Sequence, residues 1–183
     1  MSDAPAALRT LAHPVRSRLL AELRVHGDAT ATDLAAALGT NTGATSYHLR
    51  RLAEVGLVED TRTGTGRRRV WRAAPERGGL LSAETAPVDE DDAQALDWLA
   101  MDYLGHFGDR AQGWLRERGS WDATWQEVCG LEDHAVQVTA EQATAMRAEL
   151  LEVLERYRRV GQGNPQARRL VVYTCALPVE RRR

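Results

Sequence analysis

Residues 42–51 carry hydroxyl and guanidinium groups and contain no acid. Serine and threonine hydroxyls can donate or accept hydrogen bonds at several nucleic-acid bases, and arginine favours guanine O6/N7 or a phosphate. Within this stretch, Arg51 is the side chain that we expect to contact a phosphate. The positions expected to face a DNA duplex are Thr42, Gly43, Ser46, Tyr47, Arg50 and Arg51.

A second basic group surrounds the sequence Gly64-Thr65-Gly66. Guanidinium groups neutralise phosphates, so such a loop is suited to lie over the DNA backbone or in the minor groove. An arginine run alone is usually a solvated surface; this one gains weight because it surrounds a turn beside the polar stretch. Its members are Arg62, Arg67, Arg68 and Arg69, with Arg72 further along.

The elements that must position these groups are three helices and a hairpin. Apolar residues recur at helical spacing from Leu8 to Leu23, and Gly27, Gly39 and Gly56 are expected to end successive helices. The last helix has a buried face, which we assign to Thr45, Leu49 and Leu52. Segments 57–62 and 68–72 are predicted strands. A short helix, a turn and a second helix with polar residues at its start are the parts of a helix-turn-helix, and the hairpin would be its wing.

Four segments of this region resemble a known family in type and spacing. They read LAHPVR at 11–16, DLA at 33–35, TSYHLRRL at 45–52 and GLV at 56–58. Together they are similar to the ArsR-type (arsenic-repressor-like) winged helix-turn-helix regulators, over roughly residues 7–74. The resemblance implies a homodimeric, sequence-specific transcriptional regulator, usually a repressor released by an effector. It also places Ser46, Tyr47 and Arg50 on the recognition helix and His48 on its structural side.

The chain departs from the metal-sensing members of that family. Those proteins carry cysteines on the first helix of the helix-turn-helix, where this chain reads ATDLAA at 31–36. His106 and His134 have only Asp102 and Asp133 as candidate metal-ligand partners, which is a weak pattern. We therefore expect no metal site and no cofactor.

The charge distribution indicates two domains. The net charge of the 183 residues is −2, which taken alone argues against a nucleic-acid binder. Residues 1–78 hold 12 Arg and 8 acids, whereas residues 79–183 hold 12 Arg and 18 acids. We predict a DNA-binding domain at 1–78, a linker at 79–87 and a domain for dimerisation, or for an effector, at 88–183. The predicted class is α+β and mainly helical, with a small sheet in the second domain.

The second half is expected to form two long helices and two strands. One helix follows the acids at 89–92 and carries a stripe from Leu96 to Trp114; the other begins at a capping box of Thr139 and Gln142. Segments 135–138 and 170–177 are the expected strands. The aromatic residues of this half suit either a dimer face and core, which we favour, or a pocket for a small apolar or aromatic effector. They are Trp98, Tyr103, Phe107, Trp114, Trp121 and Trp125.

Other functions find less support in the sequence. There is no nucleophile elbow, phosphate-binding Gly-rich loop or His-Glu-x-x-His pattern, so we do not expect an enzyme. The absence of a long apolar run or a signal-peptide pattern, and the presence of only two cysteines, favour a cytoplasmic protein. The alternatives left open are a non-specific DNA-binding protein and a protein-interaction module without a regulatory ligand.

Overall fold

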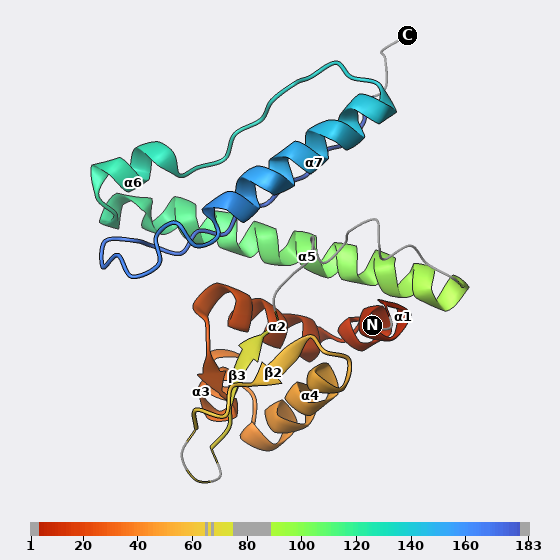
Figure 1. The fold of residues 1–183 in the computed structure, drawn as a ribbon, viewed down its shortest axis with the longest axis vertical. Coiled ribbons are helices and arrows are strands. Elements are labelled where there is room, and N and C mark those ends of the chain that lie inside the picture. The colour runs from red at the N-terminus through yellow and green to blue at the C-terminus, as the bar shows by residue number, and fades with distance from the viewer. Residues whose placement is uncertain (1–3, 65, 67, 75–88, 180–183) are drawn as a thin grey trace. The chain divides into compact units, whose positions relative to one another are not determined.

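The computed structural model describes residues 4–64, 66, 68–74 and 89–179 (Figure 1). The chain is α+β and mainly helical, as expected. It forms two compact units, Met1–Gly108 and Asp109–Arg183. The division falls inside one long helix, α5 (Glu90–Glu117). The linker predicted at 79–87 lies outside the described residues, so that boundary stays a prediction.

Four helices make up the start of the first unit, one more than expected. They are α1 (Ala4–Leu11), α2 (Pro14–His26), α3 (Ala31–Ala37) and α4 (Thr42–Glu54). The extra helix arises because the chain breaks at His13, whose Nδ1 accepts a hydrogen bond from the Val15 amide and so caps α2. Pro14 then occupies the first turn of α2, where its missing amide costs nothing.

The predicted helix ends are confirmed. Gly27, Gly39 and Gly56 have φ values of 90°, 62° and 74°, a region that L side chains rarely adopt. Thr30 caps α3 in a reciprocal box with Asp33, and Asn41 caps α4 by accepting from the Ala44 amide. Each helix of the helix-turn-helix therefore has a defined start, and its rotation about its own axis is set by what it buries.

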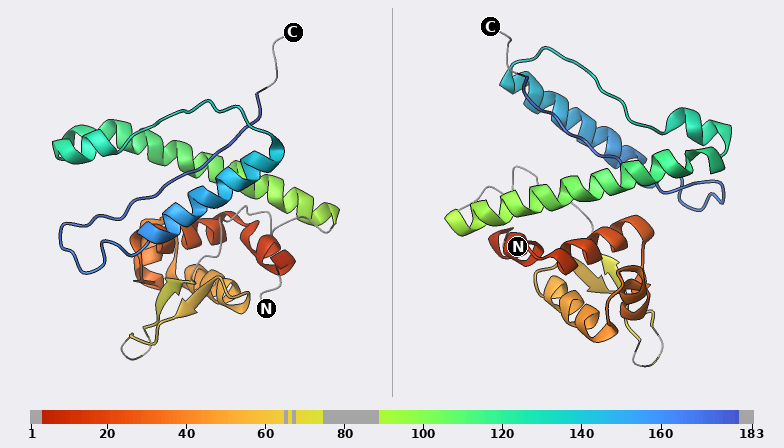
Figure 2. Two further views of the ribbon diagram at one scale, coloured as in Figure 1. Left: turned by 45° about the horizontal axis from the view of Figure 1, so that its top comes forward. Right: turned by 180° about the vertical axis from the view of Figure 1, so that it is seen from behind.

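A three-stranded antiparallel sheet completes the unit, in the order β1-β3-β2. The hairpin of β2 (Val58–Asp60) and β3 (Val70–Ala73) is the predicted one, with Asp60 opposite Trp71. The two-residue strand β1 (Ala29–Thr30), which pairs with β3, was not predicted. The hairpin projects on the side of the first unit opposite to the start of α5 (Figure 2).

The core of the first unit is made of leucines from all four helices together with Trp71 from β3. Leu19, Leu49 and Leu52 are fully buried, and Thr45 is buried beside them, as predicted for α4. Burying a leucine side chain contributes about 1.5–3 kcal/mol each. This packing holds α4 with residues 45, 49 and 52 inward and the opposite side of the helix in solvent.

The first half of α5 belongs to this unit. Asp92 is fully buried and accepts from the Nε of Arg9 at 2.6 Å, and Asp89 accepts from the same guanidinium. Ser17 in α2 donates to Asp102 at 2.6 Å. Leu99 joins the core at 1% exposure, and the inward side of α5 therefore includes Leu96 of the predicted stripe but centres on Leu99 beside it. The packed side also contains the polar residues Asp92 and Asp102, so the spacing of apolar residues alone does not identify it.

The second unit holds the end of α5, a 3₁₀ turn (Arg118–Ser120), α6 (Ala123–Val128) and α7 (Ala140–Tyr157). The capping box of Thr139 and Gln142 is confirmed. The strands predicted at 135–138 and 170–177 are wrong, because neither segment forms a ladder in the structure. Apolar, β-branched residues favour an extended backbone, but a strand also needs a neighbour in register, and neither segment has one.

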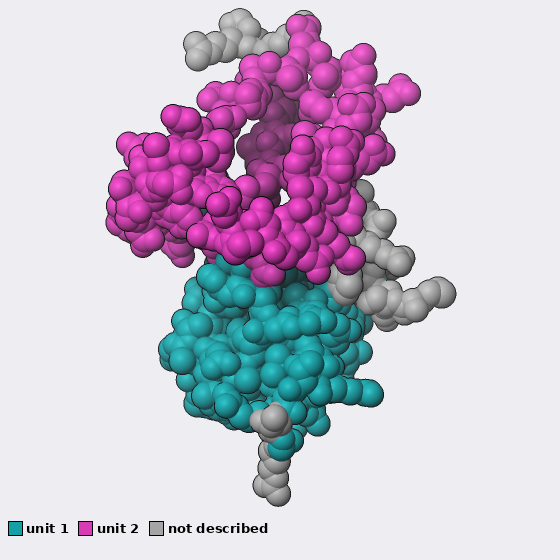
Figure 3. Space-filling model, turned by 60° about the vertical axis from the view of Figure 1, so that its left-hand side comes forward, with its two compact units in different colours: residues 1–108 teal, residues 109–183 magenta. Residues whose placement is uncertain are grey.

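The two units differ in how far their side chains are buried. No residue between 109 and 179 is buried, and the space-filling view shows a unit hollowed between its segments (Figure 3). On α7, Leu150, Val153 and Tyr157 are 46%, 43% and 65% exposed. This helix therefore carries an apolar stripe, of which Leu150, Val153 and Tyr157 are not covered by the described residues.

Candidate nucleic-acid interface

The outward side of α4 is the centre of the candidate interface. With Thr45, Leu49 and Leu52 turned into the core, the helical repeat of 100° per residue puts Gly43, Tyr47 and Arg50 on the opposite side. Those three residues are exposed, Tyr47 by 53%. A helix presented in this way can enter the DNA major groove, where its side chains reach base edges.

The polar groups on one flank of α4 face a hollow in the surface. The Nε of Arg50 donates to the Ser46 carbonyl at 3.1 Å, which ties the guanidinium along the helix toward that flank. The hollow has a volume of about 310 Å³. Its lining comes from the start of α3, from α4 and from the hairpin, and consists of Thr30, Ala31, Thr32, Thr42, Ser46, Arg50, Arg68, Arg69 and Trp71. The structure thus brings the predicted helix residues and two hairpin arginines to one place.

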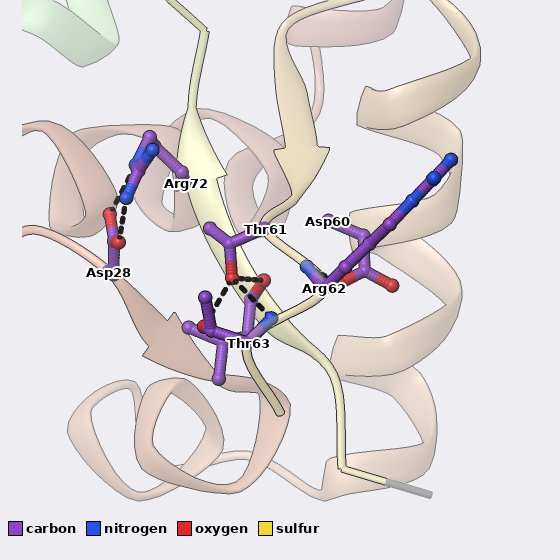
Figure 4. Close-up of polar contacts among 7 residues, drawn as sticks. Asp28, Asp60, Thr61, Arg62, Thr63 and Arg72 are labelled. Atoms are coloured by element: carbon purple, nitrogen blue, oxygen red, sulfur yellow. Dashed lines mark hydrogen bonds and ion pairs between the residues drawn. The ribbon is translucent and has the colours of Figure 1, made fainter. Parts of the chain in front are cut away.

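The loop between β2 and β3, described at 61–64, 66, 68 and 69, is the predicted wing. Its base is held by Thr61, whose hydroxyl donates to the Val70 carbonyl at 3.1 Å and lies 2.7 Å from the Thr63 hydroxyl (Figure 4). Gly64 is required where the loop folds back, because a Cβ there would lie 1.8 Å from the Arg68 carbonyl oxygen. The described part of the loop is therefore shaped by Thr61, Thr63 and Gly64.

The arginines of the wing differ in their availability. Arg62 points away from the threonine cluster (Figure 4), and Arg68 lies near enough to Asp33 for its charge to contribute to lowering the pKa of that carboxyl. Arg69 lies 3.5 Å from Asp60. Arg72 donates from Nε and Nη2 of its guanidinium to the two carboxylate oxygens of Asp28, which raises the pKa of Arg72 (Figure 4). Arg72 thus fastens β3 to the chain before β1 and is not a free DNA contact.

Some positions were not foreseen and one cannot be placed. Thr32 belongs to the hollow although nothing in its sequence spacing singled it out, and Thr30 lines it in addition to capping α3. Arg67 lies outside the described residues. Arg51, expected at a phosphate, forms an exposed ion pair with Glu54 at 2.6 Å, which a phosphate could replace.

The candidate effector aromatics do not form one group. Trp114, Trp121 and Trp125 lie together, with ring centroids 6.1 and 6.4 Å apart in sequence order. Trp98 instead packs against the core of the first unit. Tyr103 is exposed and Phe107 half-buried. Trp114, Trp121 and Trp125 of the second unit make up a local aromatic cluster.

The described residues offer little support for a metal site or a disulfide. No three His, Cys, Asp or Glu side chains among them are arranged to hold a metal ion. His106 lies 3.8 Å from Asp102, and His134 lies 3.4 Å from Glu132. Both cysteines are free thiols; Cys129 is half-buried and Cys175 is exposed. In the same part of the chain no helix has the length and apolar character needed to cross a membrane.

Comparison with known proteins agrees with this geometry. A family model for a helix-turn-helix domain matches residues 11–61, which run from the end of α1 to the first residue of the wing. No curated protein matches the chain. The match supports a helix-turn-helix DNA-binding domain in the N-terminal region, with DNA as its partner. Residues outside the match, including most of the wing and all of the second unit, depend on the structure alone for their interpretation.

Proposed function

We propose that this chain is a sequence-specific transcriptional regulator, a homodimeric repressor that binds an inverted repeat in the cytoplasm and belongs to the ArsR-type family. The observation that carries the DNA-reading part is the outward face of α4, with Tyr47 and Arg50 exposed and Ser46 beside a hollow that the wing arginines share. A protein that only coated DNA would need the basic wing, but not a polar helix face with a fixed rotation.

In this proposal the two parts of the interface have different tasks. Gly43 lets the α4 backbone approach the groove, Ser46 and Arg50 contact base edges, and Tyr47 reaches a base edge or a phosphate. The wing residues Arg62, Arg67, Arg68 and Arg69 neutralise phosphates, with Thr42 and Arg51 on the backbone at the two sides of the helix. Phosphate contacts position the protein, and base contacts specify the sequence.

Selection of binding sites from random duplex DNA tests the proposal. We expect enrichment of an inverted repeat whose half-sites lie about one helical turn, roughly 34 Å, apart. Arg50→Ala should relax the preference at one position of each half-site and cost about 1–3 kcal/mol in discrimination. Arg18→Ala, at an exposed arginine of α2, is the matched control and should leave the enriched sequence unchanged. Equal affinity for all duplexes would show that the chain binds DNA without sequence specificity. If the chain bound no DNA at all, a protein-interaction module would be the remaining interpretation.

The proposal of a homodimer is supported by the exposed apolar residues of the second unit. Its described residues bury nothing, and α7 exposes an apolar stripe that a second copy of the same helix could cover in a two-fold interface. Two copies would also present two α4 helices, which an inverted repeat requires.

Release by a small apolar or aromatic effector is the remaining part of the proposal. It is supported by the cluster of Trp114, Trp121 and Trp125, which offers flat apolar surface in the second unit. A panel of aromatic compounds should contain members that quench tryptophan fluorescence and lower DNA affinity together. Trp121→Ala should abolish both effects while leaving DNA affinity without compound intact. Quenching without any change in DNA affinity would remove the regulatory role.

A further inference from the structure

The flank of α4 opposite the hollow meets the first turn of α2 through three aromatic rings. Tyr47 contacts His48 edge-on at a centroid distance of 5.2 Å, and His48 lies 4.7 Å from His13. His13 is the residue that caps α2, so the rings connect the outward face of α4 to the start of α2. Arg16 lies in that first turn, one residue beyond the capped amide of Val15.

Basic groups gather at this junction without a matching acid. Arg16 is near enough to Arg51 for the two charges to interact; its pKa is lowered by burial first and by Arg51 second. The pKa of His48 is lowered by burial, then by His13 and by Arg16. Among the described residues the only carboxylate that pairs with any of these groups is Glu54, on Arg51. Positive groups from two helices thus converge where the chain supplies almost no compensating negative charge.

Two buried nitrogen atoms at this junction have no hydrogen-bond partner among the described residues. They are the Nε of Arg16 and the Nδ1 of His48. A buried polar group without a partner costs free energy, and its persistence calls for an explanation such as a binding partner for that group. A guanidinium beside a second guanidinium and a phenol hydroxyl is suited to a phosphate, which accepts several charge-assisted hydrogen bonds at once.

The position of this junction relative to α4 identifies the source of the phosphate. When a helix lies in the major groove, the two DNA backbones run along its two sides. The hollow and the wing occupy one side of α4, whereas the Arg16 junction occupies the other. A backbone phosphate of the second strand would therefore come to the junction as the outward face of α4 enters the groove.

We propose that Arg16, with Arg51 and Tyr47, binds a DNA backbone phosphate on the side of α4 opposite the wing. This inference rests on the proposed DNA-binding function and adds a residue outside the recognition helix and wing. The site holds α4 in register between two phosphate contacts, one on each side of the groove. It carries no sequence information, because a phosphate is the same in every base pair.

The test compares Arg16→Gln with Arg18→Gln, since Arg18 is an exposed arginine two positions further along the same helix. Arg16→Gln should weaken binding to the selected operator and to an unrelated duplex by the same factor, about tenfold. The slope of log affinity against log salt should fall by about 0.9, the value for one lost phosphate contact. Arg18→Gln should change neither quantity. Circular dichroism and thermal unfolding check that both variants fold.

A second measurement uses the wild-type protein and does not depend on a variant folding. Single methylphosphonate substitutions along one half-site remove one phosphate charge at a time. One substitution on the strand opposite the wing should weaken the wild type about tenfold, and Arg16→Lys should lose part of that sensitivity. The inference is overturned if Arg16→Gln keeps wild-type affinity and salt slope, or if no phosphate on that strand is sensitive. Failure of the wild type to bind any duplex would instead overturn the proposed function.

Discussion

The two units of this chain differ in what they do with apolar surface. The first unit buries leucines from four helices around Trp71 and leaves its polar and basic side chains outside. The second unit buries no residue between 109 and 179, although α7 carries an apolar stripe. A unit of the first kind can be stable by itself, since the hydrophobic effect acts within it. A unit of the second kind needs another surface to become stable, and this difference supports our proposal that one unit reads DNA and the other associates with a second copy.

The largest expected effect concerns the core of the first unit. Leu49→Ala removes a side chain that is 0% exposed in the middle of α4 and should lower the free energy of unfolding by about 2–5 kcal/mol. Urea denaturation followed by circular dichroism measures it. The loss should be independent of protein concentration, because the leucine is covered by its own chain. A loss below 1 kcal/mol would mean that this core is looser than its burial indicates.

The next prediction concerns α7 in the second unit. Leu150→Asp combined with Val153→Asp places two charges on the exposed apolar stripe and should weaken dimerisation at least tenfold, because an interface core excludes unpaired charge. Analytical ultracentrifugation over a range of concentrations measures the dissociation constant. Ala148→Asp, on the opposite side of the same helix, is the control and should dimerise like the wild type. Equal behaviour of all three proteins would leave the stripe of α7 without a role in association.

A smaller effect is expected at Thr45, which is buried in the same core as Leu49. Its hydroxyl oxygen has no hydrogen-bond partner among the described residues. Thr45→Val replaces the hydroxyl with a methyl group of similar size and should raise the free energy of unfolding by about 1 kcal/mol. Thr144→Val on α7 is the contrasting change, because the Thr144 hydroxyl donates to the Ala140 carbonyl and is exposed. A destabilised Thr45→Val protein would show that the hydroxyl has a partner in solution.

The first unit could be predicted from its sequence wherever a local rule decided the outcome. Glycines at 27, 39 and 56 end helices because of backbone conformation, and Thr45 with Leu49 and Leu52 forms a face because of helical spacing. Both depend on a few neighbouring residues. The same local rules explain why the candidate positions on α4 were found.

Features that depend on distant partners could not be predicted in this way. Arg72 looks like any other wing arginine until the fold places Asp28 beside it. Arg16 ends the segment LAHPVR, which assigned it no role, and its unpartnered Nε appears only when α2 and α4 pack together. The segments 135–138 and 170–177 have strand-like residues, but strand formation needs a neighbour that the second unit does not provide. Pairing across long sequence distances was therefore the common cause of the wrong and missing predictions.

The smallest effect expected is a pH dependence that distinguishes the imidazoles of the two units. Burial lowers the pKa of both His13 and His48 below 6.5, and the nearby Arg16 lowers each further. In the unfolded chain these histidines regain their ordinary pKa, so the unfolded state binds more protons as pH falls through 6.5. Stability should thus be complete above pH 6.5 and decrease as the pH falls below it toward the folded-state pKa values. The carboxylates with lowered pKa, such as Asp33 and Asp89, begin from 3.8 and lose their contribution only in more acidic solution.

Urea denaturation at pH 7.5 and at pH 5.5 separates these contributions. The wild type should be less stable at pH 5.5, and the double variant His13→Gln with His48→Gln should lose less stability between the two values. His134→Gln is the control in the second unit, because that side chain is 78% exposed and should behave like the wild type. If the double variant kept the full pH dependence, the buried imidazoles would not be its source. If His134→Gln removed the pH dependence, His134 would be buried in solution by a second copy of the chain. The exposure of the second unit would then be a property of the single chain and not of the dimer.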